Sequence, residues 1–271
     1  MKNWRLLIHP PYNGAWNMAV DEAILESTAS SSQLPTLRLY DWHPYALSLG
    51  HAQTVSDINL GALKEKRWEL VRRPTGGKAI LHADEITYSV CAPITEELIY
   101  GSVLESYRKI SKALLKSLEN MSLKADSKPK NKETFELSKN PVCFQYPSDY
   151  EITYQGRKII GSAQARKKEG LLQHGSIPLF GDITRITDVL SFPDLEKEKI
   201  SKEQLSLHAT TIKDSLGFNP GWYSTADSIR KGFEDTMHIN FINGKLSSSE
   251  LSRALIIYRE KYNNNSWTLR V

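Results

Sequence analysis

The sequence has little of what marks a secreted, membrane-spanning or metal-binding protein. It contains only two cysteines, too few for a disulfide framework or a cysteine-rich zinc site, so a reducing compartment is expected. No apolar run reaches the length of a membrane-spanning helix, and the first residues lack the apolar core of a signal peptide. Histidines, cysteines and carboxylates show no metal-ligand spacing. We therefore expect a cytoplasmic protein without a metal, a disulfide or a membrane partner.

Massed positive charge and the common nucleotide-binding and hydrolase motifs are also missing. The 271 residues carry a net charge of +4 with the basic residues spread along the chain, which disfavours nucleic acid as a partner but suits an acidic protein. There is no Walker loop, no strand–GxGxxG–helix unit and no GxSxG elbow. Hydrophobic residues make up 40% of the chain, enough for a sizeable core. The length fits one domain over residues 1–271, with a mainly helical part from about residue 181.

Strands and helices alternate along most of the chain, which predicts an α/β (α+β) fold around one mixed β-sheet flanked by helices. Strands are expected at 4–8, 37–42, 46–49, 70–73, 78–82, 86–92, 150–154, 157–165 and 171–179. Helices are expected from Asn13 onward and over 57–66, 102–118, 183–190, 225–237 and 247–262. Asp21 and Glu22 lie off the apolar stripe of the first helix, and we expect both to be solvated. Residues 122–140 are polar and are expected to form a surface loop.

The segment from Arg72 to His82 is the first candidate for a functional site. Two arginines precede a Pro-Thr-Gly-Gly turn, and a second apolar run ends on His82. Gly76 and Gly77 permit positive φ and let a ligand approach main-chain N–H groups, while Arg73 suits an anionic or polarised ligand. The alternative is a hairpin turn on the surface with ordinary basic residues.

Cys143 and Lys158 form the second candidate. Prolines flank the cysteine, and the lysine follows about fifteen residues later on the second arm of a predicted hairpin. If both side chains face one cleft, the ammonium would stabilise the thiolate and lower its pKa. The alternatives are a buried, inert thiol and a solvated strand lysine.

Gly161, Ser162 and Ala163 give the next predicted strand a run of small side chains, which lets a ligand or another backbone come close. Tight packing of the sheet against a helix explains the run equally well. His82 and His174 are both expected at strand ends. Each could also be a core histidine bonded to a backbone carbonyl.

Three ordered motifs together resemble the superfamily of lipoate–protein ligases, octanoyltransferases and biotin ligases. They are the segments 72–82, 156–166 and 171–177, and the resemblance extends from about residue 13 to 190. Cys143, placed just before the lysine strand, is similar to the nucleophile of the cysteine-dependent, LipM-type octanoyltransferases within it. Lys78 departs from the pattern, because relatives often have arginine or a small residue there, so a fork-like contact is not expected from it.

The resemblance implies an acyltransferase with a class II biotin/lipoate ligase-like catalytic domain. Octanoyl would arrive as a thioester on acyl carrier protein, Cys143 would hold it as an acyl-enzyme, and Lys158 would favour the thiolate and polarise the carbonyl. A lysine of a lipoyl domain, expected to be the glycine cleavage H protein, would accept it, and no cofactor would be needed. The implied substrate-binding residues are Arg73, Gly76, Gly77, His82, Gly161, Ser162, Ala163 and His174, with Leu81, Ile160 and Ala163 as candidates for an acyl tunnel.

Other functions remain open from the sequence. An ATP-dependent lipoate–protein ligase would use ATP and Mg²⁺ with the same glycine loop and leave Cys143 idle. An amidotransferase would move octanoyl between lipoyl domains through the same cysteine, and a non-catalytic lipoyl-binding module would keep only the pocket. A monomer is expected in each case.

Overall fold

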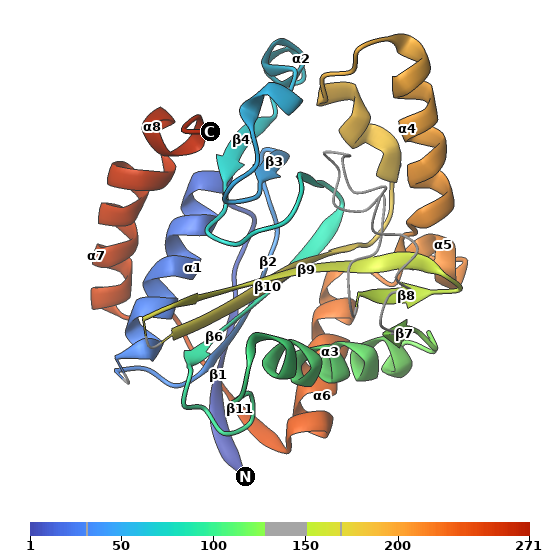
Figure 1. The fold of residues 1–271 in the computed structure, drawn as a ribbon. Coiled ribbons are helices and arrows are strands. Elements are labelled where there is room, and N and C mark those ends of the chain that lie inside the picture. Colours follow the sequence, from blue (N-terminus) through green and yellow to red (C-terminus); the bar gives the residue numbers. More distant parts are fainter. Residues whose placement is uncertain (31, 128–150, 169) are drawn as a thin grey trace.

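The computed structural model describes residues 1–30, 32–127, 151–168 and 170–271. In this part of the chain, one sheet has the strand order β11-β1-β2-β6-β10-β9-β8-β7 and a smaller one the order β4-β3-β5 (Figure 1). β1 pairs in parallel with β2 and β11, whereas the other pairs of the large sheet are antiparallel, so the predicted mixed sheet is confirmed. The strands of the large sheet are β1 (Lys2–Ile8), β2 (Thr36–Tyr40), β6 (Glu85–Pro93), β7 (Asp126–Ser127), β8 (Ile152–Tyr154), β9 (Arg157–Lys167), β10 (Gly170–Pro178) and β11 (Ile239–Asn243). The small sheet contains β3 (Ala46–Leu49), β4 (Glu69–Arg72) and β5 (Ile80–His82).

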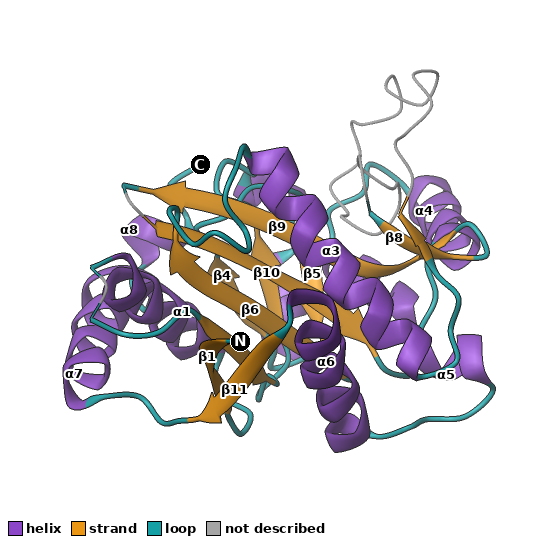
Figure 2. Cartoon of the chain, turned by 90° about the horizontal axis from the view of Figure 1, so that it is seen from below, coloured by secondary structure: helices purple, strands orange, loops and turns teal. Residues whose placement is uncertain are grey.

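Helices cover both faces of the large sheet (Figure 2). α1 and α7 pack on one face, and α3 and α6 on the other. The α-helices are α1 (Gly14–Ala29), α2 (Leu60–Glu65), α3 (Val103–Asn120), α4 (Leu195–His208), α5 (Ile212–Leu216), α6 (Trp222–Met237), α7 (Ser248–Ile257) and α8 (Asn265–Thr268). Two 3₁₀ turns, Val55–Asp57 and Ile183–Val189, and a π-helical turn, Tyr258–Tyr262, complete the helical segments of the described chain.

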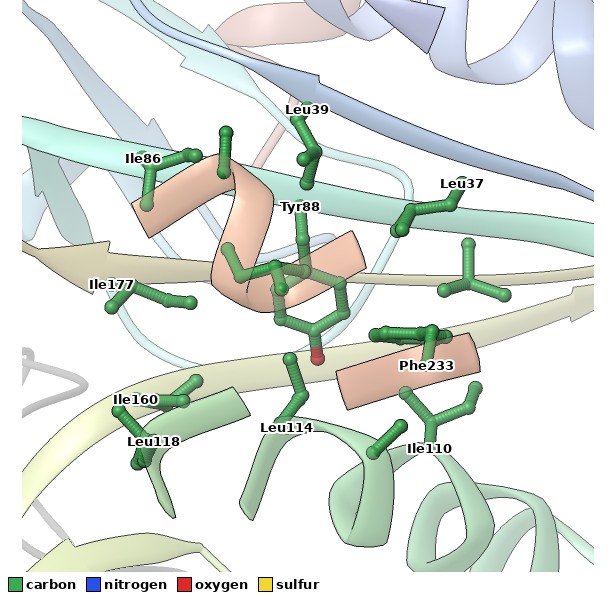
Figure 3. Packing of buried hydrophobic residues seen from close by; sticks show 14 of the residues in the cluster. Leu37, Leu39, Ile86, Tyr88, Ile110, Leu114, Leu118, Ile160, Ile177 and Phe233 are labelled. Carbon is green, nitrogen blue, oxygen red and sulfur yellow. The ribbon is translucent and has the colours of Figure 1, made fainter. Parts of the chain in front are cut away.

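The core between the sheet and α3–α6 follows from the predicted periodicities. Ile110 and Leu114 of α3 lie one turn apart and pack with Tyr88 of β6 and Phe233 of α6 (Figure 3). On β6, Tyr88 belongs to this core, whereas Cys91 belongs to the core on the α1 face, as the predicted alternation requires. The large sheet therefore has two apolar faces and lies between two helical layers.

Asp21 and Glu22 contradict the sequence-based expectation that both are solvated. Asp21 is completely buried and Glu22 is 7% exposed. Asp21 is buried because it faces the sheet, where Arg38 of β2 and His174 of β10 contact it. Glu22 is instead covered by Lys261 and Tyr262 of the π-helical turn. Asp21 forms an ion pair with Arg38, and Glu22 pairs with Lys167 and Lys261.

The structure differs locally from the predictions in several places, among them the start of one helix, the pairing of two strands and the position of one histidine. The helix expected over 57–66 begins only after Asn59, whose side chain accepts a hydrogen bond from Ala62 N. The strands around the double glycine do not form a hairpin, because β3 lies between β4 and β5. His174 lies in the middle of β10 and not at its end.

Candidate active site

The Gly76–Gly77 loop crosses one end of the small sheet. Gly77 has a φ of +95°, which glycine adopts without strain. Gly50, just after β3, lies directly against the loop, since a Cβ at position 50 would sit 1.9 Å from the carbonyl oxygen of Gly77. The close approach of these two backbones explains a glycine for which the sequence suggested no role.

Arg73 binds the loop from the inside. Its Nη2 donates to the carbonyl oxygens of Gly76 (2.9 Å) and Lys78 (2.7 Å), and its Nη1 donates to the carbonyl oxygen of Ser48 (2.9 Å). The side chain is almost completely buried. Arg73 therefore fixes the course of the loop with charge-assisted hydrogen bonds to backbone carbonyls.

Arg72 connects the same region to the loop after β3 and to the C-terminal residues. Its Nη1 donates to the carbonyl oxygens of Gly50 (2.9 Å) and Gln53 (2.6 Å), and its Nε donates to that of Thr268 (3.0 Å). Trp267 Nε1 donates in turn to the carbonyl oxygen of Arg72 at 2.8 Å. α8 thus helps to support the loop from outside.

An apolar pocket lies beside the loop and brings together five of the predicted substrate-binding residues. Arg73, His82, Gly161, Ala163 and His174 all line it, and the remaining wall includes Met18, Tyr40 and Trp42. The cavity has a volume of about 20 Å³ in this conformation. Ligand pockets typically have about 300–1,000 Å³, so an acyl chain can enter only if wall side chains move. Met18 is suited to such movement, because methionine side chains repack easily.

Several predicted residues lie outside this pocket. The Ser162 hydroxyl accepts a hydrogen bond from Tyr88 OH at 2.6 Å, and Ile160 belongs to the core on the α3 face (Figure 3). Leu81 packs against the cluster under the small sheet. Of the three candidates for an acyl tunnel, Ala163 lines this pocket, whereas Leu81 and Ile160 do not.

Gly76 and Gly77 line a separate groove and not the apolar pocket. The groove has a volume of about 800 Å³ and is open to solvent. Its wall includes Lys78, Arg166 and Lys167. The wall also includes Asp57, and the remaining excess of positive charge suits an anionic group, such as a phosphate.

Both predicted histidines are buried, and each contacts a carboxylate and a hydroxyl in place of the expected backbone carbonyl. His174 Nδ1 lies 3.4 Å from Asp21 Oδ2, and its Nε2 lies 2.7 Å from Thr75 Oγ1. Burial lowers the pKa of His174 more than the nearby Asp21 raises it, so the imidazole is neutral at pH 7.

His82 has the corresponding arrangement. Its Nδ1 lies 2.8 Å from Glu85 Oε1, and its Nε2 lies 2.8 Å from Ser48 Oγ. Its ring also stacks on Trp42 with the ring centres 3.9 Å apart. The ring plane of His82 is therefore fixed by contacts on its edges and on one face.

Lys158 is completely buried on β9, three residues before Gly161, and forms an ion pair with Glu151 Oε1. Within the described part of the chain, the lining of the apolar pocket does not include Lys158. Cys143, its predicted partner, lies outside the described residues. The predicted contact between thiol and ammonium therefore stays a prediction.

Cys91, the other cysteine, is buried in the core on the α1 face. Burial raises the pKa of its thiol far above the ordinary value, and the sulfur lies 3.5 Å from the carbonyl oxygen of Asp21. Such a thiol is a poor nucleophile. Among the described residues, no group of three or more histidine, cysteine or carboxylate side chains is arranged to hold a metal ion. None of the described helices has the length and apolar character needed to cross a bilayer.

Residues 13–234 match the family model of the lipoyl protein ligase A/B catalytic domain. This chain belongs to that family. Among curated members, the octanoyltransferase LipM of Carboxydothermus hydrogenoformans is 40% identical and that of Brevibacillus brevis 34% identical, with both chains covered completely in each comparison. This family member is accordingly an acyltransferase.

Solved structures of the family share the fold. A bi-partite lipoate protein ligase from Thermoplasma acidophilum, studied with its E2 lipoyl domain, has a TM-score of 0.83 and 23% identity, covering 99% of this chain and 97% of its own. A lipoate–protein ligase A bound with ATP has a TM-score of 0.81 and 24% identity, covering 99% of both chains. At these identities the likeness establishes the fold of this family member.

Sequence reasoning missed the carboxylates that contact the two histidines. The only signal for Asp21 is its spacing from Asn17, because two polar residues four positions apart share one side of a helix. That side faces Arg38, whose Nη1 donates to Asp21 at 2.7 Å and whose Nη2 donates to Asn17 at 2.7 Å. Glu85 gave no signal, since it opens a strand next to another acidic residue.

Proposed function

We propose that this chain transfers an octanoyl group from acyl carrier protein to a lysine of a lipoyl domain through a thioester on Cys143. The observation that carries the proposal is the convergence of the three motifs on an apolar pocket beside a basic groove. The full-length similarity to octanoyltransferases supports octanoyl transfer in protein lipoylation. The relative studied with its E2 lipoyl domain supports a lipoyl domain as the acceptor.

The two half-reactions balance without ATP. The Cys143 thiolate attacks the octanoyl thioester, the bond to the carrier sulfur breaks, and the carrier leaves as a thiol after taking a proton. The neutral amine of the acceptor lysine then attacks the enzyme thioester, forms the amide, loses its proton and releases the thiolate. A thioester is higher in free energy than an amide, so the net transfer is downhill.

The chain's own groups supply two kinds of assistance in this proposal. The apolar pocket takes the octanoyl chain after its wall side chains move, which places the reacting carbonyl near the Gly76–Gly77 loop. Lys158 favours the thiolate form of Cys143 and stabilises negative charge on the carbonyl oxygen in the transition state. The burial of Lys158 supports this role, because a charge in a water-poor site acts strongly on its neighbours.

The two cysteines provide a matched test of the acyl-enzyme. Incubation with octanoyl-carrier should add one octanoyl group to the intact protein, and peptide mapping should place it on Cys143. The Cys91→Ala variant should still be acylated, because that thiol is buried in the core. The Cys143→Ala variant should not be acylated, and full turnover by this variant would remove the acyl-enzyme from the proposal.

The role of Lys158 needs a variant that separates catalysis from stability. Lys158→Met alone leaves the buried carboxylate of Glu151 without its ammonium, which should lower stability by about 3–5 kcal/mol. The double variant Lys158→Met/Glu151→Leu removes both charges and should recover most of that stability. If Lys158 acts in catalysis, the double variant remains inactive, whereas recovered activity would assign the pair to stability alone.

An ATP-dependent lipoate–protein ligase is the second candidate. The basic groove beside the glycine loop favours it, since the same surface suits a nucleotide phosphate. Incubation with ATP and lipoate, followed by assay for pyrophosphate, distinguishes the two. Pyrophosphate release would favour the ligase, and octanoyl transfer without nucleotide would favour the transferase.

A further inference from the structure

A buried chain of hydrogen bonds leads from α1 to the loop that carries the double glycine. Asp21 of α1 contacts His174 of β10 over 3.4 Å, and His174 contacts the hydroxyl of Thr75 over 2.7 Å. All three side chains are buried. Thr75 immediately precedes Gly76, so these hydrogen bonds end on the loop that contributes Arg73 to the apolar pocket and Gly76 and Gly77 to the basic groove.

A second chain of hydrogen bonds, also made of a carboxylate, an imidazole and a hydroxyl, reaches the same loop. Glu85 contacts His82 over 2.8 Å, and His82 contacts the hydroxyl of Ser48 over 2.8 Å. Arg73 Nη1 donates to the same hydroxyl at 3.1 Å. Arg73 also donates to carbonyl oxygens of the loop. The hydrogen bonds that begin at Glu85 therefore reach the loop through the guanidinium of Arg73.

The chemistry of the first chain fixes the positions of its protons. Asp21 can only accept hydrogen bonds when it is ionised, and it already accepts them from Arg38 at 2.7 Å and from Tyr40 OH at 2.9 Å. A neutral His174 therefore carries its proton on Nδ1, facing Asp21, and its Nε2 accepts the hydrogen bond from the Thr75 hydroxyl. The direction of every hydrogen bond in this chain follows from the charge of Asp21.

We propose that Asp21 and Glu85 are positioning residues that act through His174 and His82 to hold the segment 73–78 in the place that acyl transfer requires. This inference deepens the proposed function and rests on it for its catalytic part. Neither carboxylate needs to touch the substrate. Each sets the orientation of an imidazole, and the imidazole sets that of the loop.

The Asp21→Asn variant tests the first chain most directly. The amide oxygen must stay with Arg38, so the amide NH₂ faces His174 Nδ1 and forces the imidazole proton onto Nε2. The Thr75 hydroxyl must then accept from Nε2–H instead of donating to Nε2, so this hydrogen bond reverses and the hydroxyl proton turns away from the imidazole. Long-range ¹H–¹⁵N spectra should show this reversal of the His174 tautomer, and kcat for octanoyl transfer should fall about 10- to 100-fold with a smaller change in KM, as expected for a misplaced reacting group.

Two further variants separate positioning from general loss of stability. Thr75→Val removes the hydroxyl at the loop end, leaves the Asp21–Arg38 ion pair intact, and should lower kcat by a similar factor with the Nδ1–H tautomer retained. Glu250→Gln weakens the ion pair with Arg5, which is also buried but is built from β1 and α7, outside the site. It should lower the unfolding temperature while kcat stays unchanged.

Hydrogen exchange at the amides of His51 and Arg73, which donate to the carbonyl oxygens of Thr75 (2.8 Å) and Leu49 (3.0 Å), gives a readout that does not depend on the acyl donor. Exchange should be faster in the Asp21→Asn and Thr75→Val variants than in the Glu250→Gln control. The inference is overturned if His174 keeps its tautomer in the Asp21→Asn variant, or if these amides exchange as in the control.

The failure of the proposed function would look different. Wild-type protein would not transfer octanoyl at all. The His174 tautomer and the exchange data would still decide whether the hydrogen bonds from Asp21 through His174 to Thr75 position the loop. If the Asp21→Asn variant does not fold, the Thr75→Val variant decides through kcat and amide exchange. The Ser48→Ala variant removes the hydroxyl between His82 and Arg73 and gives the corresponding test for the second chain through kcat and amide exchange.

Discussion

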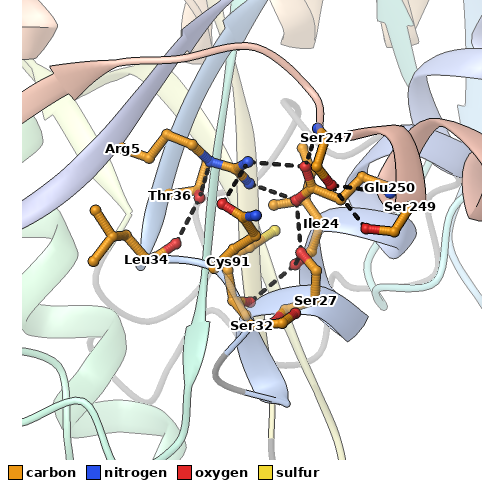
Figure 4. A network of polar contacts seen from close by, with 12 residues as sticks. Arg5, Ile24, Ser27, Ser32, Leu34, Thr36, Cys91, Ser247, Ser249 and Glu250 are labelled. Carbon is orange, nitrogen blue, oxygen red and sulfur yellow. Dashed lines mark hydrogen bonds and ion pairs between the residues drawn. The ribbon is translucent and has the colours of Figure 1, made fainter.

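Removing the carboxylate of Glu250 should destabilise the protein far more than removing that of Glu105, which has the same capping-box position in α3. Glu250 is completely enclosed and binds Arg5 through both oxygens, with Arg5 Nη2 at 2.6 Å from Oε1 and Nη1 at 2.8 Å from Oε2 (Figure 4). Oε1 also accepts from the Ser27 hydroxyl, and Oε2 accepts from Ser247 N in the capping box of α7. One side chain thus links β1, α1 and α7.

The size of the effect follows from these contacts. Breaking a buried ion pair by removing one partner costs about 3–5 kcal/mol, because the other charge stays buried. Loss of the helix cap adds about 1 kcal/mol. Glu250→Ala should therefore lower the free energy of unfolding by about 4–6 kcal/mol and the melting temperature by about 10–20 °C.

Urea unfolding at pH 7, followed by circular dichroism, measures this loss. The control is Glu105→Ala, because Glu105 occupies the same position in the capping box of α3 but is exposed. The free energy of unfolding should fall several times less in Glu105→Ala than in Glu250→Ala. Equal decreases in the two variants would refute the argument from the buried charge.

The pH dependence gives a second check. Burial alone would raise the pKa of Glu250, but hydrogen bonds from Arg5, Ser27 and Ser247 outweigh it, and the net shift is downward. A carboxylate with a lowered pKa stabilises the fold above its ordinary value of 4.5 and loses this contribution as the pH falls. The difference between the wild type and the Glu250→Ala variant should therefore shrink on acidification.

Three further predictions concern other parts of the fold. Burial raises the pKa of Asp41 to about 6, so the folded state loses stability as the pH rises from 3.8 toward 6. The Asp41→Asn variant should therefore have a free energy of unfolding about 1–2 kcal/mol higher than the wild type at pH 7, after allowance for solvent screening. Urea unfolding should show no such increase near pH 3. Gly50→Ala should displace the loop, since its Cβ would lie 1.9 Å from Gly77 O, and octanoyl transfer should fall at least about tenfold; an unchanged rate would contradict the role given to Gly50. Gly232→Ala should force α6 away from α3, because its Cβ would lie 2.2 Å from Ser117 Oγ, and urea unfolding should show a loss of about 1–3 kcal/mol.

Local patterns in the sequence predicted most elements, and pairings distant in sequence explain the failures. β6 was predictable because its alternating residues serve two separate cores. β11 was missed because it is a short, largely exposed strand, and its parallel pairing with β1 is visible only in three dimensions. α4 was missed because its exposed face is rich in lysine and glutamate and it buries only Ser201 and Leu205.

The candidate site was predictable in its members but not in its arrangement. The motifs identified Arg73, His82 and His174, and the structure brings all three to one pocket. The sequence could not reveal that Arg73 binds the loop's own carbonyls, because this depends on how the backbone turns around Gly77. It also could not reveal the burial of Asp21, since Arg38, which neutralises it, comes from a strand seventeen residues later.

The pairing of the first and last strands of the large sheet has a consequence for biosynthesis. Lys2 of β1 pairs with Ile239 of β11, so this edge of β1 stays unpaired until residues 239–243 have been synthesised. An open edge can pair with other chains, and contacts between such distant segments slow folding. Newly synthesised protein should therefore be most prone to edge-to-edge association before β11 has paired with β1.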